Sequence, residues 1–124
     1  MKKVFVYGTL KVGGRFSKLV AKFRHNSKSA TTTGTMFSVS GDYPALILAG
    51  DTTILGELHE YDDEAFPILN RIEGYRGPNN PNNLYNLEEI EVTLTDGAKD
   101  RALVYTFAEN TTNLSIVENG CWPI

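Results

Sequence analysis

The stretch Val4-Phe5-Val6-Tyr7-Gly8-Thr9-Leu10 gives the clearest indication of the fold. Its β-branched and aromatic residues predict a buried strand over Lys3–Tyr7 that ends at Gly8. Glycine permits a sharp turn there, because it adopts backbone angles that clash for other residues. The N–H groups of Gly8, Thr9 and Leu10 would then converge on a carboxylate or a developing oxyanion. The plainer alternative for so short a motif is an ordinary turn from strand to loop.

The threonine-rich region that follows predicts further strands. Ser29–Val39 has strand-like composition, and Gly34 within it predicts a bulge or a bend. Ala45–Leu48 and Thr53–His59 are short apolar or β-branched runs on either side of Gly50-Asp51. We expect these two runs to be the arms of a hairpin, because Gly and Asp favour turns.

The last third of the chain predicts two more strands. Ile90, Val92 and Leu94 alternate with polar residues, which is typical of a strand with one buried face. Asp96-Gly97 predicts a turn, and Arg101–Phe107 is expected to be the strand that follows it.

Two short helices are expected between these strands. The first is indicated by apolar residues at helical spacing: Phe16, Leu19, Val20 and Phe23. For the second, Asp62 and Asp63 supply N-cap chemistry, and Pro67 must lie in the first turn to avoid losing an interior hydrogen bond. Gly74 suits the left-handed residue that closes a helix. The apolar stripe of this helix is Phe66, Leu69 and Ile72.

About six strands and two short helices predict an α+β fold, built as a small mixed β-barrel or curled sheet. The chain has 124 residues, of which 41% are hydrophobic and 22% charged. These values are ordinary for a globular protein, and we expect residues 1–124 to form a single domain.

Charge and cysteine content argue against several classes of protein. The formal net charge is −3 and the longest basic run is Lys2-Lys3, which argues against a nucleic-acid-binding protein. No apolar stretch approaches the roughly 20 residues of a membrane helix, and the N-terminus does not resemble a signal peptide. We therefore expect a cytoplasmic protein that does not bind membranes. Cys121 is the single cysteine, which excludes an internal disulfide and a multi-cysteine zinc site.

Glu73 is the acidic residue best placed for proton transfer. It lies at the predicted C-terminus of the second helix, where the helix dipole disfavours a negative charge. In a semi-apolar pocket, desolvation would raise the pKa of Glu73 toward neutrality, which suits a general acid or base. On spacing alone, a solvated glutamate at a helix end is the more ordinary interpretation. Glu57 is the alternative carboxylate, but the alternation around it predicts a solvated, outward-facing side chain.

Tyrosine is abundant, and its aromatic rings and hydroxyl groups suit a substrate pocket. Core tyrosines with paired hydroxyl groups are the plainer alternative for each one. The residues concerned are Tyr7, Tyr43, Tyr75, Tyr85 and Tyr105.

The motifs taken together resemble the γ-glutamylcyclotransferase-like family, also called AIG2-like. The resemblance rests on their order along nearly the whole chain. After the opening strand and turn come Tyr43-Pro44-Ala45-Leu46, Gly56-Glu57-Leu58, the run from Leu69 to Tyr75, Tyr85, Ala102-Leu103-Val104-Tyr105, and the closing Ile116 with Gly120-Cys121-Trp122.

The resemblance implies a small mixed barrel flanked by two helices, with a cavity at one end. It implies that Glu73 transfers protons and that Tyr7, Gly8, Thr9, Leu10 and Tyr85 bind the substrate. The implied substrate is a γ-glutamyl amide. Its own α-amine attacks the γ-carbonyl, so that 5-oxoproline forms and an amine leaves. No metal or cofactor is implied.

Three departures from the family pattern leave the substrate open. Asn70 stands where the family usually has aspartate, Asn86-Leu87 where an arginine is common, and Asn119-Gly120-Cys121-Trp122 where Ser-Gly-Asp-Trp is more usual. These differences also allow an alternative function, a non-catalytic protein that binds or sequesters a metabolite or nucleotide in the same cavity.

Overall fold

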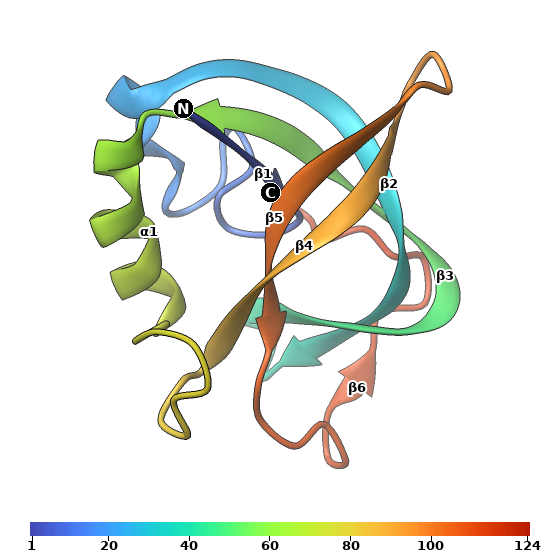
Figure 1. Cartoon of the computed structure of the whole chain (residues 1–124). Coiled ribbons are helices and arrows are strands. Elements are labelled where there is room, and N and C mark those ends of the chain that lie inside the picture. The colour runs from blue at the N-terminus through green and yellow to red at the C-terminus, as the bar shows by residue number, and fades with distance from the viewer.

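The computed structural model describes residues 1–124. The chain forms a small β-barrel with helical turns outside it (Figure 1). The strands are β1 Lys2–Val6, β2 Arg24–Val39, β3 Tyr43–Tyr61, β4 Tyr85–Leu94, β5 Lys99–Phe107 and β6 Ser115–Ile116. The helical elements are the 3-10 turns η1 Ser17–Leu19, η2 Ala21–Phe23 and η3 Asp63–Ala65, and the α-helix α1 Phe66–Glu73.

The barrel is closed because β3 pairs on both of its edges. The strand order is β3-β1-β5-β4-β2-β6, and β2 pairs with β3 as well. β1 and β5 are parallel, whereas the other pairs are antiparallel. Five strands thus form a closed ring and β6 adds to β2 outside it, which confirms the predicted α+β fold with a small mixed barrel.

The predicted hairpin across Gly50-Asp51 is wrong. β3 runs continuously from Tyr43 to Tyr61 and pairs along its length with β2. Between Gly34 and Thr35 the register jumps, since Gly34 lies opposite Thr52 and Thr35 opposite Ile47. The Gly-Asp pair therefore lies in a bulge that bends a long strand, and the predicted irregularity at Gly34 is its counterpart on β2.

The two predicted helical regions differ in outcome. Residues 16–23 form η1 and η2, two 3-10 turns that meet at Val20, instead of one amphipathic α-helix. α1 has Pro67 in its first turn and ends at Gly74, whose φ of 63° and ψ of 34° are left-handed, as predicted. Neither Asp62 nor Asp63 caps α1, because the turn η3 precedes it and the Asp62 carboxylate pairs with His25 at 2.8 Å.

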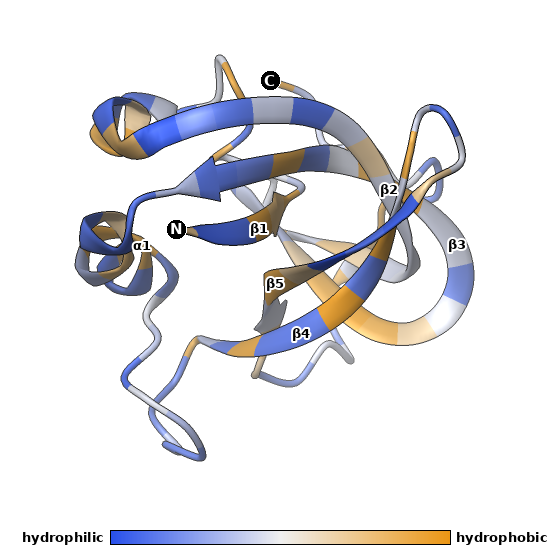
Figure 2. Ribbon diagram, turned by 45° about the horizontal axis from the view of Figure 1, so that its top comes forward, coloured by the Kyte–Doolittle hydropathy of each residue, from blue (hydrophilic) through white to orange (hydrophobic).

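Two apolar clusters lie on opposite faces of the barrel wall. In β1, Phe5 belongs to the cluster with members from all five barrel strands, whereas Val4 and Val6 belong to the cluster that contains Leu69 of α1. Side chains alternate across a strand, so β1 contributes to both clusters. Figure 2 shows the same alternation of hydrophilic and hydrophobic residues along β4. Because the second cluster packs β1 against α1, the ends of these two elements lie close together.

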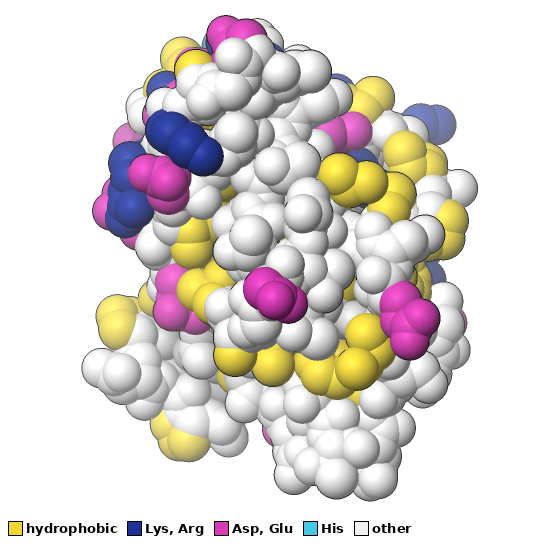
Figure 3. All heavy atoms as spheres, turned by 90° about the vertical axis from the view of Figure 1, so that its right-hand side faces the viewer, with side chains coloured by type: hydrophobic (Ala, Val, Ile, Leu, Met, Phe, Trp, Pro, Cys, Tyr) yellow, Lys and Arg dark blue, Asp and Glu magenta, His cyan; other side chains and the backbone are white.

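The surface agrees with the modest net charge. On the face shown in Figure 3, Lys and Arg side chains are few and acidic side chains are scattered among them, without a basic patch on that face. No helix of the structure has the length and apolar character needed to cross a membrane.

Candidate active site

The backbone directly after β1 presents unpaired N–H groups. Gly8 and Thr9 accept hydrogen bonds through their carbonyls, from the N–H groups of Lys11 and Phe16 at 3.0 Å each. The N–H groups of Gly8, Thr9 and Leu10 donate no hydrogen bond within the protein. Gly8 and Leu10 are buried and Thr9 is half-buried, and three adjacent N–H groups without a protein partner are suited to an anion.

Glycine at position 8 is required by close packing. A Cβ atom at Gly8 would lie 2.4 Å from Cγ of Pro44, near the start of β3. The pyrrolidine ring of Pro44 therefore supports this loop from behind. We call the loop Gly8–Leu10, with its three free N–H groups, the cradle.

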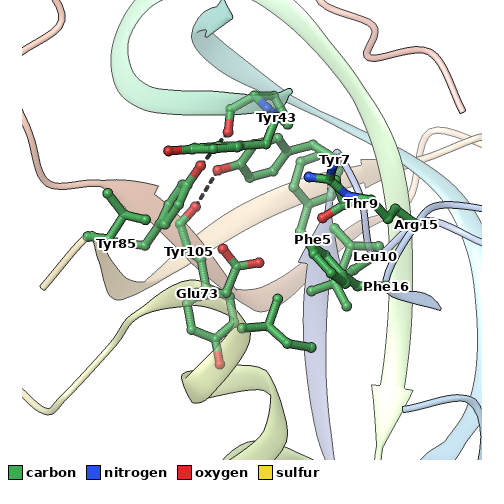
Figure 4. A pocket seen from close by; sticks show the side chains of 15 residues that line it. Phe5, Tyr7, Thr9, Leu10, Arg15, Phe16, Tyr43, Glu73, Tyr85 and Tyr105 are labelled. Carbon is green, nitrogen blue, oxygen red and sulfur yellow. Dashed lines mark hydrogen bonds between the residues drawn. The ribbon is translucent and has the colours of Figure 1, made fainter. Parts of the chain in front are cut away.

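Glu73, the last residue of α1, directs its carboxyl group into the cavity that the cradle borders (Figure 4). Neither carboxyl oxygen has a hydrogen bond or an ion pair within the protein. Burial raises the pKa of Glu73 to about 8, because the charged form loses water without gaining a partner. A carboxyl group in this state exchanges its proton near neutral pH.

The cavity has a volume of about 230 Å³ and is lined by every residue predicted for the site. The predicted residues are Tyr7, Gly8, Thr9, Leu10, Glu73 and Tyr85. The remainder of the lining is mostly apolar or aromatic, and includes Phe5, Phe16, Tyr43, Pro44, Ile72 and Leu84. A concave, largely apolar hollow with a few polar groups is the usual form of a small-molecule site.

Three of the five tyrosines serve both of the roles considered for them. Tyr7, Tyr85 and Tyr105 line the cavity, yet their hydroxyl groups donate to the Tyr105 carbonyl at 2.6 Å, the Pro44 carbonyl at 2.5 Å and Asn70 Oδ1 at 2.7 Å, respectively. Burial raises the pKa of Tyr7 and of Tyr85 far above the ordinary value, so both remain protonated donors. The bonds of Tyr7 and Tyr85 hold the cavity wall together (Figure 4), and the bond of Tyr105 to Asn70 joins this wall to α1.

The expectation for Glu57 is wrong. Its side chain is 21% exposed, and Oε1 accepts hydrogen bonds from the Val12 N–H and from His59 Nε2, both at 2.9 Å. The loop after the cradle folds over this side chain, which an alternating strand pattern does not reveal. Glu57 therefore fixes the loop and does not line the cavity.

Tyr43, one of the tyrosines considered for a pocket, also lines the cavity, and so does Arg15, which we did not predict as a site residue. Arg15 follows the Gly13-Gly14 pair, a local sign of an irregular loop near the cradle. Nothing in the sequence indicates that its side chain turns toward the cavity. The residues present include no group of three or more His, Cys, Asp or Glu that would hold a metal ion.

Comparison with known proteins identifies the family. The model of the family described as "Gamma-glutamyl cyclotransferase, AIG2-like" matches residues 4–123. The chain belongs to this family. One relative with a similar sequence is the γ-L-glutamyl-butirosin B γ-glutamyl cyclotransferase of Niallia circulans, which is 30% identical over 97 residues. The match covers 78% of this chain and 62% of the relative, so the chain spans less than two thirds of the relative's length.

Solved structures share the fold of this family member. YkqA from Bacillus subtilis superposes with a TM-score of 0.74 at 24% identity, over 98% of this chain and 39% of YkqA. An AIG2-like protein from Mus musculus superposes with a TM-score of 0.69 at 21% identity, over 95% of this chain and 86% of the mouse protein. At these identities the likeness establishes the fold alone.

One departure from the usual family pattern has a structural explanation. Asn70 on α1 accepts the hydrogen bond of the Tyr105 hydroxyl through Oδ1, and an aspartate oxygen would accept it equally. The closing motif keeps a role through its backbone, since the Trp122 carbonyl accepts a hydrogen bond from Lys11 Nζ at 2.5 Å.

Proposed function

We propose that this protein is a γ-glutamyl cyclotransferase that releases 5-oxoproline and an amine from a γ-glutamyl amide. The observation that carries the proposal is the arrangement across one cavity of a desolvated, unpartnered Glu73 and the three free N–H groups of the cradle. Family membership and the relative named for a γ-L-glutamyl substrate support the same reaction class.

The reaction needs no nucleophile from the protein, because the substrate carries its own. The α-amine of the γ-glutamyl group attacks the γ-carbonyl carbon, a C–N bond forms, and a tetrahedral oxyanion results. The bond to the leaving amine then breaks, which closes the five-membered ring of 5-oxoproline. When such a folded conformer is held, the effective molarity reaches about 10⁵–10⁸ M. We therefore propose that the reaction proceeds without a cofactor.

Glu73 supplies the proton transfers in this scheme. The substrate ammonium must lose one proton before it attacks and a second when its nitrogen becomes the ring amide, and the leaving nitrogen takes up both to depart as an ammonium. Because burial raises the pKa of Glu73 to about 8, its carboxylate accepts the proton of the substrate ammonium at a lower cost than an ordinary glutamate would. Glu73 returns this proton to the leaving nitrogen as the C–N bond breaks. The ring nitrogen gives up its second proton to Glu73 as the ring amide forms, and this proton passes to the released amine, which departs as an ammonium, so the balance of protons closes. General acid–base catalysis of this kind contributes about 10²–10⁴-fold.

The cradle positions the substrate in this scheme. The N–H groups of Gly8, Thr9 and Leu10 bind the α-carboxylate of the γ-glutamyl group, and the aromatic walls of Tyr7 and Tyr85 exclude water. Exclusion of water strengthens each of these polar contacts. Because both tyrosine hydroxyl groups are already donors to backbone carbonyls, their part is to shape the pocket.

The test is a panel of γ-glutamyl amides with different leaving amines, in which 5-oxoproline is followed by chromatography. We expect turnover by the wild-type protein and a loss of about 10²–10⁴-fold in kcat for Glu73→Gln, because glutamine keeps the shape but transfers no proton. The matched control is Glu64→Gln, in which an exposed glutamate of η3 is changed and activity is retained. Equal activity of Glu73→Gln and wild type would contradict the role of Glu73.

The same panel separates catalysis from binding alone. A ligand that binds tightly, is never converted and is insensitive to Glu73→Gln would instead support the alternative of a metabolite- or nucleotide-binding protein.

A further inference from the structure

Arg15 is the only positively charged side chain that lines the cavity. It enters on the same side as Thr9 and Leu10, whereas Glu73 lies across from them (Figure 4). The carbonyl of Thr9 accepts a hydrogen bond from the N–H of Phe16, which fixes the backbone next to Arg15 against the cradle. Arg15 and the cradle thus line the same cavity, on the side across from Glu73.

Arg15 is an exposed residue, and its guanidinium has one hydrogen bond within the protein and no ion pair. Its Nη2 donates to the Asp42 carbonyl at 3.2 Å, and its Cζ lies 4.9 Å from the centre of the Phe16 ring. No ion pair of the protein includes Arg15. A guanidinium has five N–H donors, so most of them remain free, in a fork that matches a carboxylate.

Two independent features therefore favour an anion in one place. The cradle offers three backbone donors and Arg15 offers a full positive charge, while the only acidic side chain of the lining is Glu73 on the opposite side. Among the groups of a γ-glutamyl amide, the α-carboxylate alone is anionic. The α-amine and the γ-carbonyl, in contrast, must face the proton-transferring residue.

We propose that Arg15 is a specificity-determining residue that binds the α-carboxylate of the γ-glutamyl group together with the cradle. This inference rests on the proposed function. It assigns to this chain a preference for substrates with that carboxylate over amides of 4-aminobutanoic acid, which carry the same amine and carbonyl but lack it.

The product pair 5-oxoproline and 2-pyrrolidinone isolates the carboxylate, since the two molecules differ in nothing else. We expect wild-type protein to bind 5-oxoproline at least 10-fold more tightly by calorimetry or by NMR shifts of the Gly8–Leu10 amides. In Arg15→Gln this preference should fall by about 10- to 100-fold, the usual range for a charge-assisted contact, and Arg15→Lys should retain part of it. The control is Lys18→Gln, which changes an exposed cation of η1 outside the cavity lining.

Turnover of matched amides gives the second readout. Arg15→Gln should raise KM for a γ-glutamyl methylamide by about 10- to 100-fold, whereas KM for the slow cyclisation of 4-aminobutanoyl methylamide to 2-pyrrolidinone should change much less. If only substrates with a carboxylate on the leaving amine, such as γ-glutamylglycine, respond to Arg15→Gln, the guanidinium binds the leaving group and the inference is overturned.

The outcomes for the inference and for the proposed function are distinguishable. Turnover with a carboxylate preference that Arg15→Gln does not alter overturns the inference and leaves the proposed function standing. Absence of turnover, with an Arg15-dependent preference for 5-oxoproline over 2-pyrrolidinone, overturns the proposed function and supports carboxylate recognition by Arg15. Absence of both overturns both.

Discussion

Glu57 and Glu73 are both half-buried glutamates, yet their surroundings are opposite. One oxygen of Glu57 accepts two hydrogen bonds, from the Val12 N–H and from His59 Nε2, whereas Glu73 has no partner at all. A carboxylate whose oxygen already accepts hydrogen bonds from the protein holds a loop in place. A carboxyl group with free oxygens, facing a cavity, is available to a substrate proton. The difference in partners, and not in residue type, separates the two roles.

The side chains next to Glu57 are hydrogen-bonded to one another. His59 is fully buried, and its Nδ1 lies 2.8 Å from the Tyr61 hydroxyl. Burial lowers the pKa of His59, so the ring is neutral at pH 7; with Nε2–H donated to Glu57, Nδ1 accepts from Tyr61. On the cavity side, by contrast, Glu73 and the N–H groups of the cradle have no partners, as a site that exchanges ligands requires.

The largest effect that would sharpen this comparison is a pH-dependent gain of stability in Glu73→Gln. The pKa of Glu73 is about 8 in the folded protein against 4.5 for the ordinary group, so the folded state holds a proton that the unfolded state has lost between these values. The free energy of unfolding of wild type therefore falls as pH rises from 4.5 to 8. We expect Glu73→Gln to be more stable than wild type by about 2–4 kcal/mol at pH 8.5 and nearly equal to it at pH 4.5.

Urea unfolding at the two pH values measures this difference, with Glu64→Gln as the control that shows no such pH dependence. A constant offset between Glu73→Gln and wild type would mean that Glu73 does not hold a proton in the folded protein.

A smaller effect is expected from Glu57→Ala. This change leaves the buried His59 N–H and the Val12 N–H without an acceptor, which costs about 1–3 kcal/mol. Glu57→Gln keeps the carbonyl oxygen at Oε1 and should cost less. Urea unfolding gives the stabilities, and hydrogen exchange at Val12 should be faster in Glu57→Ala than in Glu57→Gln. Identical exchange rates in the two variants would show that the hydrogen bond from Val12 to Glu57 does not hold this loop in place.

The smallest effect is expected at Asn70. Asn70→Asp preserves an oxygen for the Tyr105 hydroxyl and should change the free energy of unfolding by less than about 1 kcal/mol. Asn70→Leu removes the acceptor and should destabilise the protein more, since the hydroxyl loses its partner. Thermal unfolding of both variants measures this, and equal losses would show that the hydrogen bond is not what Asn70 contributes.

Local patterns were sufficient to predict the elements that carry the site. The β-branched run before Gly8, the alternation in β4 and the closing Gly74 each follow from neighbouring residues, and the structure has all three. The six predicted site residues line one cavity because β1 and α1 end, and β4 begins, beside it. Their catalytic and binding roles remain proposals.

Features set by distant contacts were not predictable in the same way. Gly50-Asp51 carries a turn signal, but pairing with β2 keeps the strand continuous and turns the pair into a bulge. The orientation of Arg15 depends on a carbonyl 27 residues away, at Asp42. The barrel closes because β3 pairs with both β1 and β2, and no local periodicity in the sequence indicates these pairings.

The most direct test of the central claim is an NMR titration of the Glu73 carboxyl carbon, assigned by its absence in Glu73→Gln. A desolvated carboxyl group without a partner should titrate with a pKa of about 8. Titration near the ordinary value of 4.5 would show a solvated or partnered carboxylate, and would contradict Glu73 as the residue that transfers protons in this cavity.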